Sequence, residues 1–265
     1  MSDAAERYAP GWSDDAVAMM SSRTAGRRAR FLLPFLANGM DALDVGCGPG
    51  TITLGLTEAV APDGSVVGVD VEPSQVDAAR ATAHDAGVTN VDFHVGSVYE
   101  LPFAAERFDA VLAHGLVEHL ARPDDALREL RRVLRAGGVV GVCSSDWSSA
   151  VVEPRTADVD VALACHFTLR RRAGGDPFAG VRLRALAEAA GFADVRVSVQ
   201  DESDMSYGEL ARYVGSRIEA AARDAAASDR AELLRGAAAA ARWARHKHGC
   251  FTQRWVAITA RRPRI

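Results

Sequence analysis

The 265-residue sequence lacks the features that mark membrane-spanning, secreted and metal-binding chains. No apolar run approaches the roughly 20 residues that span a bilayer. The N-terminal MSDAAERYAP shows no charged-then-apolar signal pattern. The four cysteines form no CxxC pair and have no histidine partner at metal-ligand spacing. We therefore expect a cytoplasmic protein with reduced thiols, no metal and no membrane partner.

A large excess of charge of either sign is also missing. The chain has 31 Lys and Arg against 35 Asp and Glu, which gives a net charge of −4. Such a balanced chain carries no electrostatic footprint for nucleic acid, and the basic tail RRPRI is too short to change that. We expect a small-molecule substrate and no nucleic-acid partner. A homodimer is a possible assembly.

What the sequence does contain is a glycine-rich stretch, DALDVGCGPGT, at residues 41–51. A short apolar run carries Asp44 and ends at Gly46, Gly48 and Gly50, and the residues that follow have helix-forming character. A strand that ends in a glycine turn and opens a helix is a ligand-binding corner of an open α/β sheet. Glycine permits the tight turn and lets a ligand approach without a Cβ in the way.

The glycine spacing narrows the class of ligand. A dinucleotide-binding loop reads G-x-G-x-x-G, but Thr51 stands where its third glycine would be, and no basic residue near the turn indicates a P-loop. The pattern Asp-x-Gly-x-Gly-x-Gly resembles motif I of the class I S-adenosylmethionine-dependent methyltransferases. We assign Asp44, Cys47 and the three glycines to the cofactor site. The alternative is a tight turn that binds nothing.

A second apolar run, VVGVD at 66–70, ends in an acid. Asp70 follows Gly50 by 20 residues, a distance at which an acid accepts hydrogen bonds from both ribose hydroxyls. The agreement of strand end and spacing favours this role over that of an exposed loop aspartate. We place Val71 and Gln75, which follow it, in the same cofactor site.

Further landmarks follow in order. A third strand at 91–95 leads into the loop 96–98, and the resemblance implies that this loop (Gly96, Ser97 and Val98) holds the adenine. A fourth strand at 108–112 leads to His114, which the same resemblance places on the sulfur side of the cofactor. The phrase RVLRAGG, before a fifth strand at 139–143, also resembles a signature of these methyltransferases.

With four landmarks in order over 41–143, the chain is identified as a member of the class I methyltransferases, of the type found in ubiquinone biosynthesis. The resemblance implies an α/β fold with a doubly wound, seven-stranded, Rossmann-like sheet and helical cap insertions. It also implies that the last strand, at 251–260, runs antiparallel between the fifth and sixth. We expect a single domain over 1–265 with its cofactor-binding core at 41–143.

Three segments lie outside that core. Residues 1–40 are predicted to form one or two cap helices, from which Tyr8, Met20 and Arg23 reach a ligand. Residues 144–180 lack a strand–helix rhythm and are predicted to be a substrate wall, and 201–248 are predicted to be a helical lid. Arg23 is a candidate partner for the methionine carboxylate, with a solvated helix arginine as the alternative.

The sequence offers few candidate bases for the acceptor. His119 and Glu118 follow the fourth strand, and Asp146 is expected to follow the fifth. The hypothesis is that His119 acts as a general base with Asp146 as its partner, because histidine titrates near neutral pH. The alternative is that His119 packs structurally, as it often does in the Glu-His-Leu stretch of this family.

The leading functional hypothesis is transfer of a methyl group from S-adenosyl-L-methionine to an O, N or C atom of a small organic acceptor. The Ala- and Arg-rich composition fits a bacterial secondary-metabolite pathway. One alternative is a methyltransferase that acts on RNA or protein. The net charge of −4 argues against an RNA substrate. Another is a protein of the same fold that binds the cofactor but catalyses a rearrangement or cyclisation.

Overall fold

The computed structural model describes residues 20, 23–203 and 205–264. The predicted N-terminal cap therefore enters the description only in part, and Tyr8 lies outside the described residues. Within it, Ala25–Arg28 form a short helix and Leu33–Phe35 a 3-10 turn.

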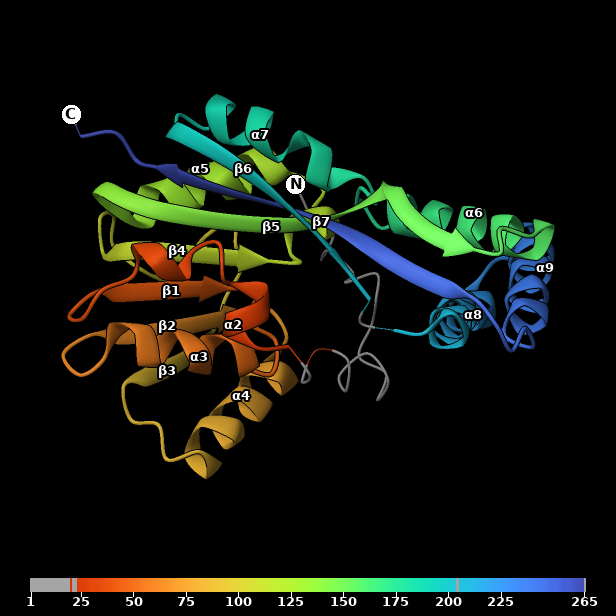
Figure 1. Cartoon of the computed structure of the whole chain (residues 1–265), viewed down its shortest axis with the longest axis horizontal. Helices are drawn as coiled ribbons and strands as arrows, with labels where there is room; N and C mark the ends of the chain where they lie inside the picture. Colours follow the sequence, from red (N-terminus) through yellow and green to blue (C-terminus); the bar gives the residue numbers. More distant parts are fainter. Residues whose placement is uncertain (1–19, 21–22, 204, 265) are drawn as a thin grey trace.

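In the described chain, seven strands form one sheet in the order β3-β2-β1-β4-β5-β7-β6 (Figure 1). Neighbouring strands from β3 to β5 are parallel, whereas β7 runs antiparallel to both β5 and β6. The predicted doubly wound sheet and the predicted place of its last strand are both confirmed. The strands are β1 (Asp41–Val45), β2 (Ser65–Asp70), β3 (Val91–Val95), β4 (Phe108–His114), β5 (Leu134–Glu153), β6 (Ala193–Glu202) and β7 (Cys250–Arg261).

Helices cover both faces of this sheet. Because side chains alternate along a strand, Leu43 of β1 packs with Leu127 of α5, whereas its neighbour Ala42 packs with Leu56 of α3. Burial of each such leucine contributes about 1.5–3 kcal/mol. The helical elements are α2 (Ala25–Arg28), η1 (Leu33–Phe35), α3 (Thr51–Val60), α4 (Pro73–Asp85), η2 (Val117–His119), α5 (Pro123–Val133), α6 (Ala157–Arg172), η3 (Ala179–Arg182), α7 (Leu183–Ala189), α8 (Tyr207–Asp224) and α9 (Ala227–Trp243).

The Gly137-Gly138 pair lies inside β5. Glycines commonly cap the C-terminus of a helix, so the sequence predicts this pair just after a helix instead. Helix α5 ends at Val133, and the fully buried Leu134 already pairs with Phe108 of β4. The register between the two strands then shifts before Val139, with Gly137 at a φ of +80°. The apolar burial of Leu134 ends the helix before the glycines are reached.

Residues 144–180 have regular secondary structure, contrary to expectation, and their role as a substrate wall stays a prediction. Strand β5 continues to Glu153 and pairs with β7 beyond a register shift between Asp146 and Val151. Helix α6 then begins at Ala157, and the side chain of the preceding Thr156 caps it by accepting a hydrogen bond from the Val159 amide. Polar residues interrupt the apolar period of α6 near its end, and for this reason the sequence pattern did not predict the helix.

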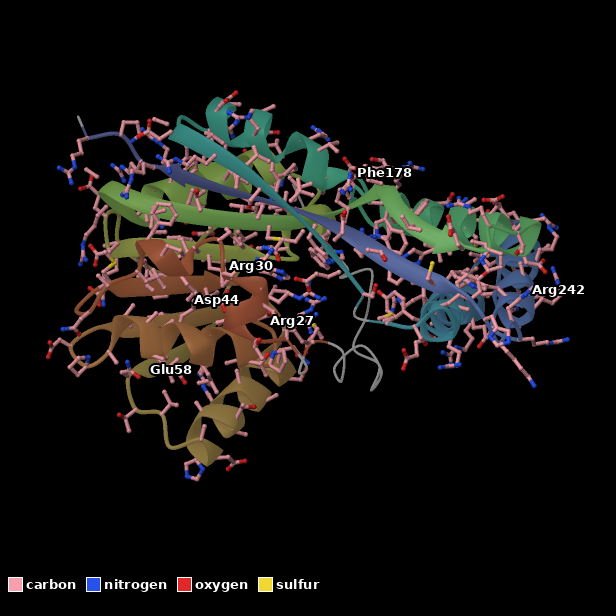
Figure 2. The ribbon with its side chains drawn as sticks, viewed as in Figure 1. Arg27, Arg30, Asp44, Glu58, Phe178 and Arg242 are labelled. Atoms are coloured by element: carbon pink, nitrogen blue, oxygen red, sulfur yellow. The ribbon has the colours of Figure 1, made fainter. Side chains whose placement is uncertain are left out.

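Helices α6, α8 and α9 form a separate helical layer around the far ends of β5 and β7 (Figure 1). The residues of α8 predicted to share a face, namely Tyr207, Leu210, Val214 and Ile218, are all buried. Figure 2 shows Arg242 on α9, far from Asp44 in β1, and its guanidinium binds Asp158 of α6 at 2.7–3.1 Å. The predicted helical character of 201–248 is thus confirmed by two helices packed on α6, and the role of this segment as a lid stays a prediction.

Candidate active site

The turn between β1 and α3 needs glycine for two different reasons. Gly46, Gly48 and Gly50 all have positive φ, at +74°, +52° and +81°. A Cβ on Gly50 would lie 2.9 Å from Ala79 Cβ, so α4 packs directly against the turn. A Cβ on Gly48 would instead lie 3.7 Å from Met20 Sδ and 4.0 Å from Gln75 Oε1. Gly50 therefore serves packing, and Gly48 presents bare backbone to the side where Gln75 lies.

Asp44 and Cys47 direct their side chains into the protein. Asp44 is buried and accepts a hydrogen bond of 2.7 Å from the Thr53 hydroxyl of α3. Burial, reinforced by the nearby charge of Asp70, raises the pKa of Asp44 to about 7. The Cys47 thiol packs among residues of α4 and β3, where burial raises its pKa. Cofactor contact by these two residues stays a prediction.

Asp70 lies at the end of β2 against the glycine turn, as the spacing predicted. Its Oδ2 accepts a hydrogen bond from the Gly48 amide at 2.8 Å, and its Oδ1 accepts one from the Glu72 amide at 3.0 Å. Burial raises its pKa, and these amides oppose the rise. A carboxylate has about four acceptor sites on its two oxygens, so capacity for a ribose hydroxyl remains beside the backbone amides of Gly48, Val71 and Glu72. Val71 is exposed, and buried Gln75 has an Oε1 without a donor in the described chain.

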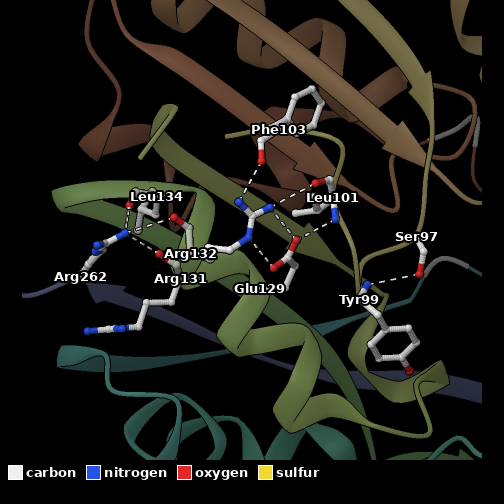
Figure 3. A network of polar contacts seen from close by, with 9 residues as sticks. All are labelled: Ser97, Tyr99, Leu101, Phe103, Glu129, Arg131, Arg132, Leu134 and Arg262. Carbon is white, nitrogen blue, oxygen red and sulfur yellow. Dashed lines mark hydrogen bonds and ion pairs between the residues drawn. The ribbon is translucent and has the colours of Figure 1, made fainter. Parts of the chain in front are cut away.

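The segment that follows the loop 96–98 is held in place by α5 (Figure 3). Glu129 of α5 accepts a hydrogen bond from the Leu101 amide at 2.7 Å, and Arg132 donates to the Phe103 carbonyl at 2.8 Å. Arg132 and Glu129 also form a two-pronged ion pair. Val98 itself packs in the main core cluster. The segment after the predicted adenine loop is thus anchored, while adenine contact by Gly96, Ser97 and Val98 stays a prediction.

The end of α5 is fixed in turn by the C-terminal strand. Arg262, which follows β7, donates to the carbonyls of Arg131, Arg132 and Leu134 at 2.7–3.2 Å (Figure 3). These are carbonyls that a helix end leaves without intrahelical donors. A residue remote in sequence therefore supports the helix that anchors the segment after the loop 96–98.

A basic and aromatic corner lies at the end of β4, next to the glycine turn. His114 is buried and stacks on Trp255 of β7, with ring centroids 5.0 Å apart. Arg23 lies over the same indole at 5.6 Å, and its Nη1 is 3.5 Å from where a Cβ on Gly115 would be. Burial, together with the charges of Arg23 and Arg28, holds the pKa of His114 well below its usual range.

The corner bears on the Arg23 prediction. Arg23 precedes α2 rather than lying within it, and its Nε is buried without an acceptor in the described part of the chain. The solvated helix arginine considered as an alternative is therefore wrong. Both ring nitrogens of His114 are likewise buried without a described partner. Contact of Arg23 and His114 with the methionine part of the cofactor stays a prediction that this position favours.

The predicted pair of His119 and Asp146 does not form. Asp146 lies inside β5 rather than after it, and its Oδ1 accepts hydrogen bonds from the Ser148 amide and hydroxyl at 2.9 and 2.6 Å. His119 Nδ1 instead faces the Arg170 guanidinium at 3.4 Å. Because a guanidinium only donates, Nδ1 is the acceptor and the neutral ring carries its proton on Nε2. Burial and then Arg170 lower the pKa of His119, which weakens it as a base.

Glu118, the other candidate base, is held in a buried network. Its carboxylate accepts hydrogen bonds from the hydroxyls of Ser144 and Ser145 and from the Ser145 amide. Arg170 Nη2 lies 4.0 Å from Glu118 Oε1. Arg170 was missed in the sequence, although its position four residues after His166 places both on one face of a helix once α6 is recognised.

These residues fit an adenosyl sulfonium cofactor. The bare backbone at Gly48, the spare acceptor sites of Asp70 and the unpartnered Oε1 of Gln75 lie together at the carboxyl ends of β1 and β2. A sheet of this order with its polar groups at that edge defines a nucleoside-binding class of α/β proteins. Among the described residues, no helix is long and apolar enough to cross a membrane, and no group of three or more His, Cys, Asp and Glu is placed to hold a metal.

Comparison with known proteins identifies the family within that class. A family model described as a methyltransferase domain matches residues 36–172. The chain is 31% identical to an uncharacterized methyltransferase of Schizosaccharomyces pombe, over 92% of this chain and 92% of that protein. The chain belongs to this methyltransferase family and is an enzyme that uses S-adenosylmethionine.

Solved structures agree on the fold. The (4+2)-cyclase SpnF aligns with a TM-score of 0.55 and 24% identity, covering 94% of this chain and 81% of that one. Haemonchus contortus phosphoethanolamine N-methyltransferase 2, solved with S-adenosylhomocysteine, aligns with a TM-score of 0.58 and 18% identity, covering 90% and 53%. At these identities both likenesses bear on the fold alone.

Proposed function

We propose that this enzyme methylates a small organic acceptor bound between the end of β4, β5 and the helical layer. The observation that carries the proposal is the enclosure of polar groups there: Glu118 is 3% exposed and Arg170 7%. A site walled this closely suits a molecule small enough to be surrounded, rather than a nucleic acid or a protein surface. The net charge of −4 also argues against RNA.

The residues of the chain act chiefly by placement. S-adenosylmethionine supplies a methyl group on a positively charged sulfur. Asp70 and the glycine turn hold its nucleoside, and Arg23, beside His114, lies where a methionine carboxylate would be paired. The acceptor is then aligned with the methyl group and shielded from water, which lowers the entropic part of the barrier. His119 is a weak candidate for a general base, because burial and Arg170 hold its pKa well below the usual range.

Calorimetry with S-adenosylhomocysteine tests the cofactor part of the proposal. Asp70→Asn should weaken the dissociation constant by about 10- to 100-fold, because hydrogen bonds to a charged acceptor contribute roughly 1.5–3 kcal/mol. Asp85→Asn, an exposed change at the end of α4, is the control and should bind like the wild type. An Asp70→Asn variant with wild-type affinity would contradict the placement of the ribose.

One specific observation favours a second candidate function. SpnF, whose fold this chain shares, is a cyclase, so a scaffold of this kind is compatible with cofactor binding without methyl transfer. The two functions differ in their products. Conversion of an acceptor with one equivalent of S-adenosylhomocysteine formed supports methylation, whereas conversion without it supports rearrangement or cyclisation. A parallel incubation with tRNA and a mixed protein substrate tests the macromolecular alternative.

A further inference from the structure

The buried face of α6 changes character along its length. Near its start the face consists of apolar residues such as Val159 and Leu163, which pack against α8 and α9. Near its end the same face carries His166 and Arg170, which are only 3% and 7% exposed. A helix that only packed against its neighbours would keep an apolar face throughout. The polar end of α6 faces η2, at the end of β4, through the Arg170 contact with His119.

Both polar residues keep hydrogen-bonding capacity that nothing in the described chain uses. Neither ring nitrogen of His166 has a partner there, and the Nε of Arg170 has no acceptor. A buried polar group left unpaired costs about 1–3 kcal/mol. A structural role for Arg170 as the partner of Glu118 does not account for this, because the 4.0 Å separation is no hydrogen bond. Glu118 is already satisfied by Ser144 and Ser145.

Aromatic rings from three different elements surround His166. Trp147 of β5, Phe167 of α6 and Tyr213 of α8 have ring centroids 6.2, 6.0 and 5.9 Å from that of His166. Trp147 also packs against Phe167 at 5.4 Å. Such rings provide flat apolar walls and are common in sites for ring-containing ligands.

Two cations, Arg170 and Arg217, act on His166, and the Glu118 carboxylate lies 4.0 Å from Arg170 Nη2. Arg170 is always protonated. The charges that act on His166, after burial itself, come from Arg170 and Arg217, and together these hold the pKa of His166 at about 3. The imidazole is therefore neutral, and the guanidinium carries the charge. This combination of a buried cation, a neutral imidazole and aromatic walls complements a planar anion.

We propose that His166 and Arg170, together with Trp147, Phe167 and Tyr213, form the recognition end of the acceptor site, and that the acceptor is a flat, ring-containing organic acid. Arg170 binds the carboxylate, His166 donates or accepts one further hydrogen bond, and the aromatic residues flank the ring. A guanidinium suits a carboxylate because its donors match the two oxygens in one plane. This inference rests on the proposed function, since it names the substrate class for that same site.

The test compares matched acids and amides in the presence of saturating S-adenosylhomocysteine. Benzoate, cinnamate and indole-3-acetate are titrated beside their primary amides, with calorimetry as the readout. We expect at least one acid to bind the wild type ten-fold or more tighter than its amide. Arg170→Met should abolish this preference, and Arg170→Lys should retain only part of it. Arg171→Met, an exposed neighbour on α6, is the control and should keep the full preference.

The outcomes separate this inference from the proposed function. Failure of the wild type to bind S-adenosylhomocysteine would contradict the proposed function. Normal cofactor binding with no acid bound, with acid and amide bound equally, or with the preference intact in Arg170→Met overturns the substrate class alone. Thermal unfolding and cofactor affinity verify that each variant is folded. If Arg170→Met does not fold, Arg170→Lys and His166→Phe replace it, and wild-type acid preference in both would overturn the inference.

Discussion

A methyl group added to Gly50 should destabilise the protein far more than the same methyl group added to Gly39. Both glycines have nearly the same backbone conformation, with φ values of +81° and +82°. They differ in surroundings: a Cβ on Gly50 meets Ala79 Cβ at 2.9 Å and Phe93 Cζ at 3.1 Å, whereas nothing lies within 4 Å of one on Gly39. The pair therefore separates backbone strain from steric overlap.

The magnitudes follow from these two terms. An alanine held at positive φ costs about 1–2 kcal/mol, which is the expected loss for Gly39→Ala. Gly50→Ala carries the same strain plus an overpacking cost of about 1–3 kcal/mol, for a total of roughly 2–5 kcal/mol. Gly26→Ala, in helix α2 with open space around it, has neither cost and should stabilise the protein by up to about 1 kcal/mol.

The assay is urea unfolding of the four proteins without ligand, followed by circular dichroism, with an unchanged m-value as the check that only stability has changed. Equal losses for Gly39→Ala and Gly50→Ala would refute the close packing of α4 on the glycine turn. Gly48→Ala extends the series, because its Cβ would meet nothing closer than Met20 Sδ at 3.7 Å and would therefore not overlap α4. It should resemble Gly39→Ala in stability but lose affinity for S-adenosylhomocysteine.

Two further predictions concern ionisation and helix capping. Because burial raises the folded pKa of Asp44 to about 7, above its ordinary value of 3.8, the wild type should lose stability as pH rises from about 4 to about 7. Asp44→Asn cannot ionise, so its melting temperature relative to the wild type should rise between about pH 5 and about pH 8, and a pH-independent difference would count against the buried carboxyl. Ser206→Ala removes the capping box at the start of α8 and should cost about 1 kcal/mol in urea unfolding. Ser228→Ala, at the exposed start of α9, is its control, and an equal effect of the two changes would show that the cap does not hold α8.

The sequence by itself determined the nucleotide-binding half of this protein. The glycine turn, Asp70 and the loop 96–98 are recognisable because each depends on local backbone requirements at the end of a strand. Parallel strands bring those ends to one edge of the sheet, so residues identified separately in the sequence meet in space. The Gly48 amide and the Asp70 carboxylate meet in this way at 2.8 Å.

The arrangement of β5, β7 and the helical layer was decided only by the tertiary structure. Strand β5 is long because its second part pairs with β7, with Val151 opposite Thr252, and no local pattern reveals a partner about a hundred residues away. That pairing places Asp146 inside a strand and away from His119. The same pairing leads into α6. This helix was not predicted from the sequence, because His166 and Arg170 interrupt the apolar period of its buried face. Hydrophobic periodicity in a sequence reveals only those helix faces that pack in an apolar core. A buried helix face that carries polar residues is therefore not detected by it.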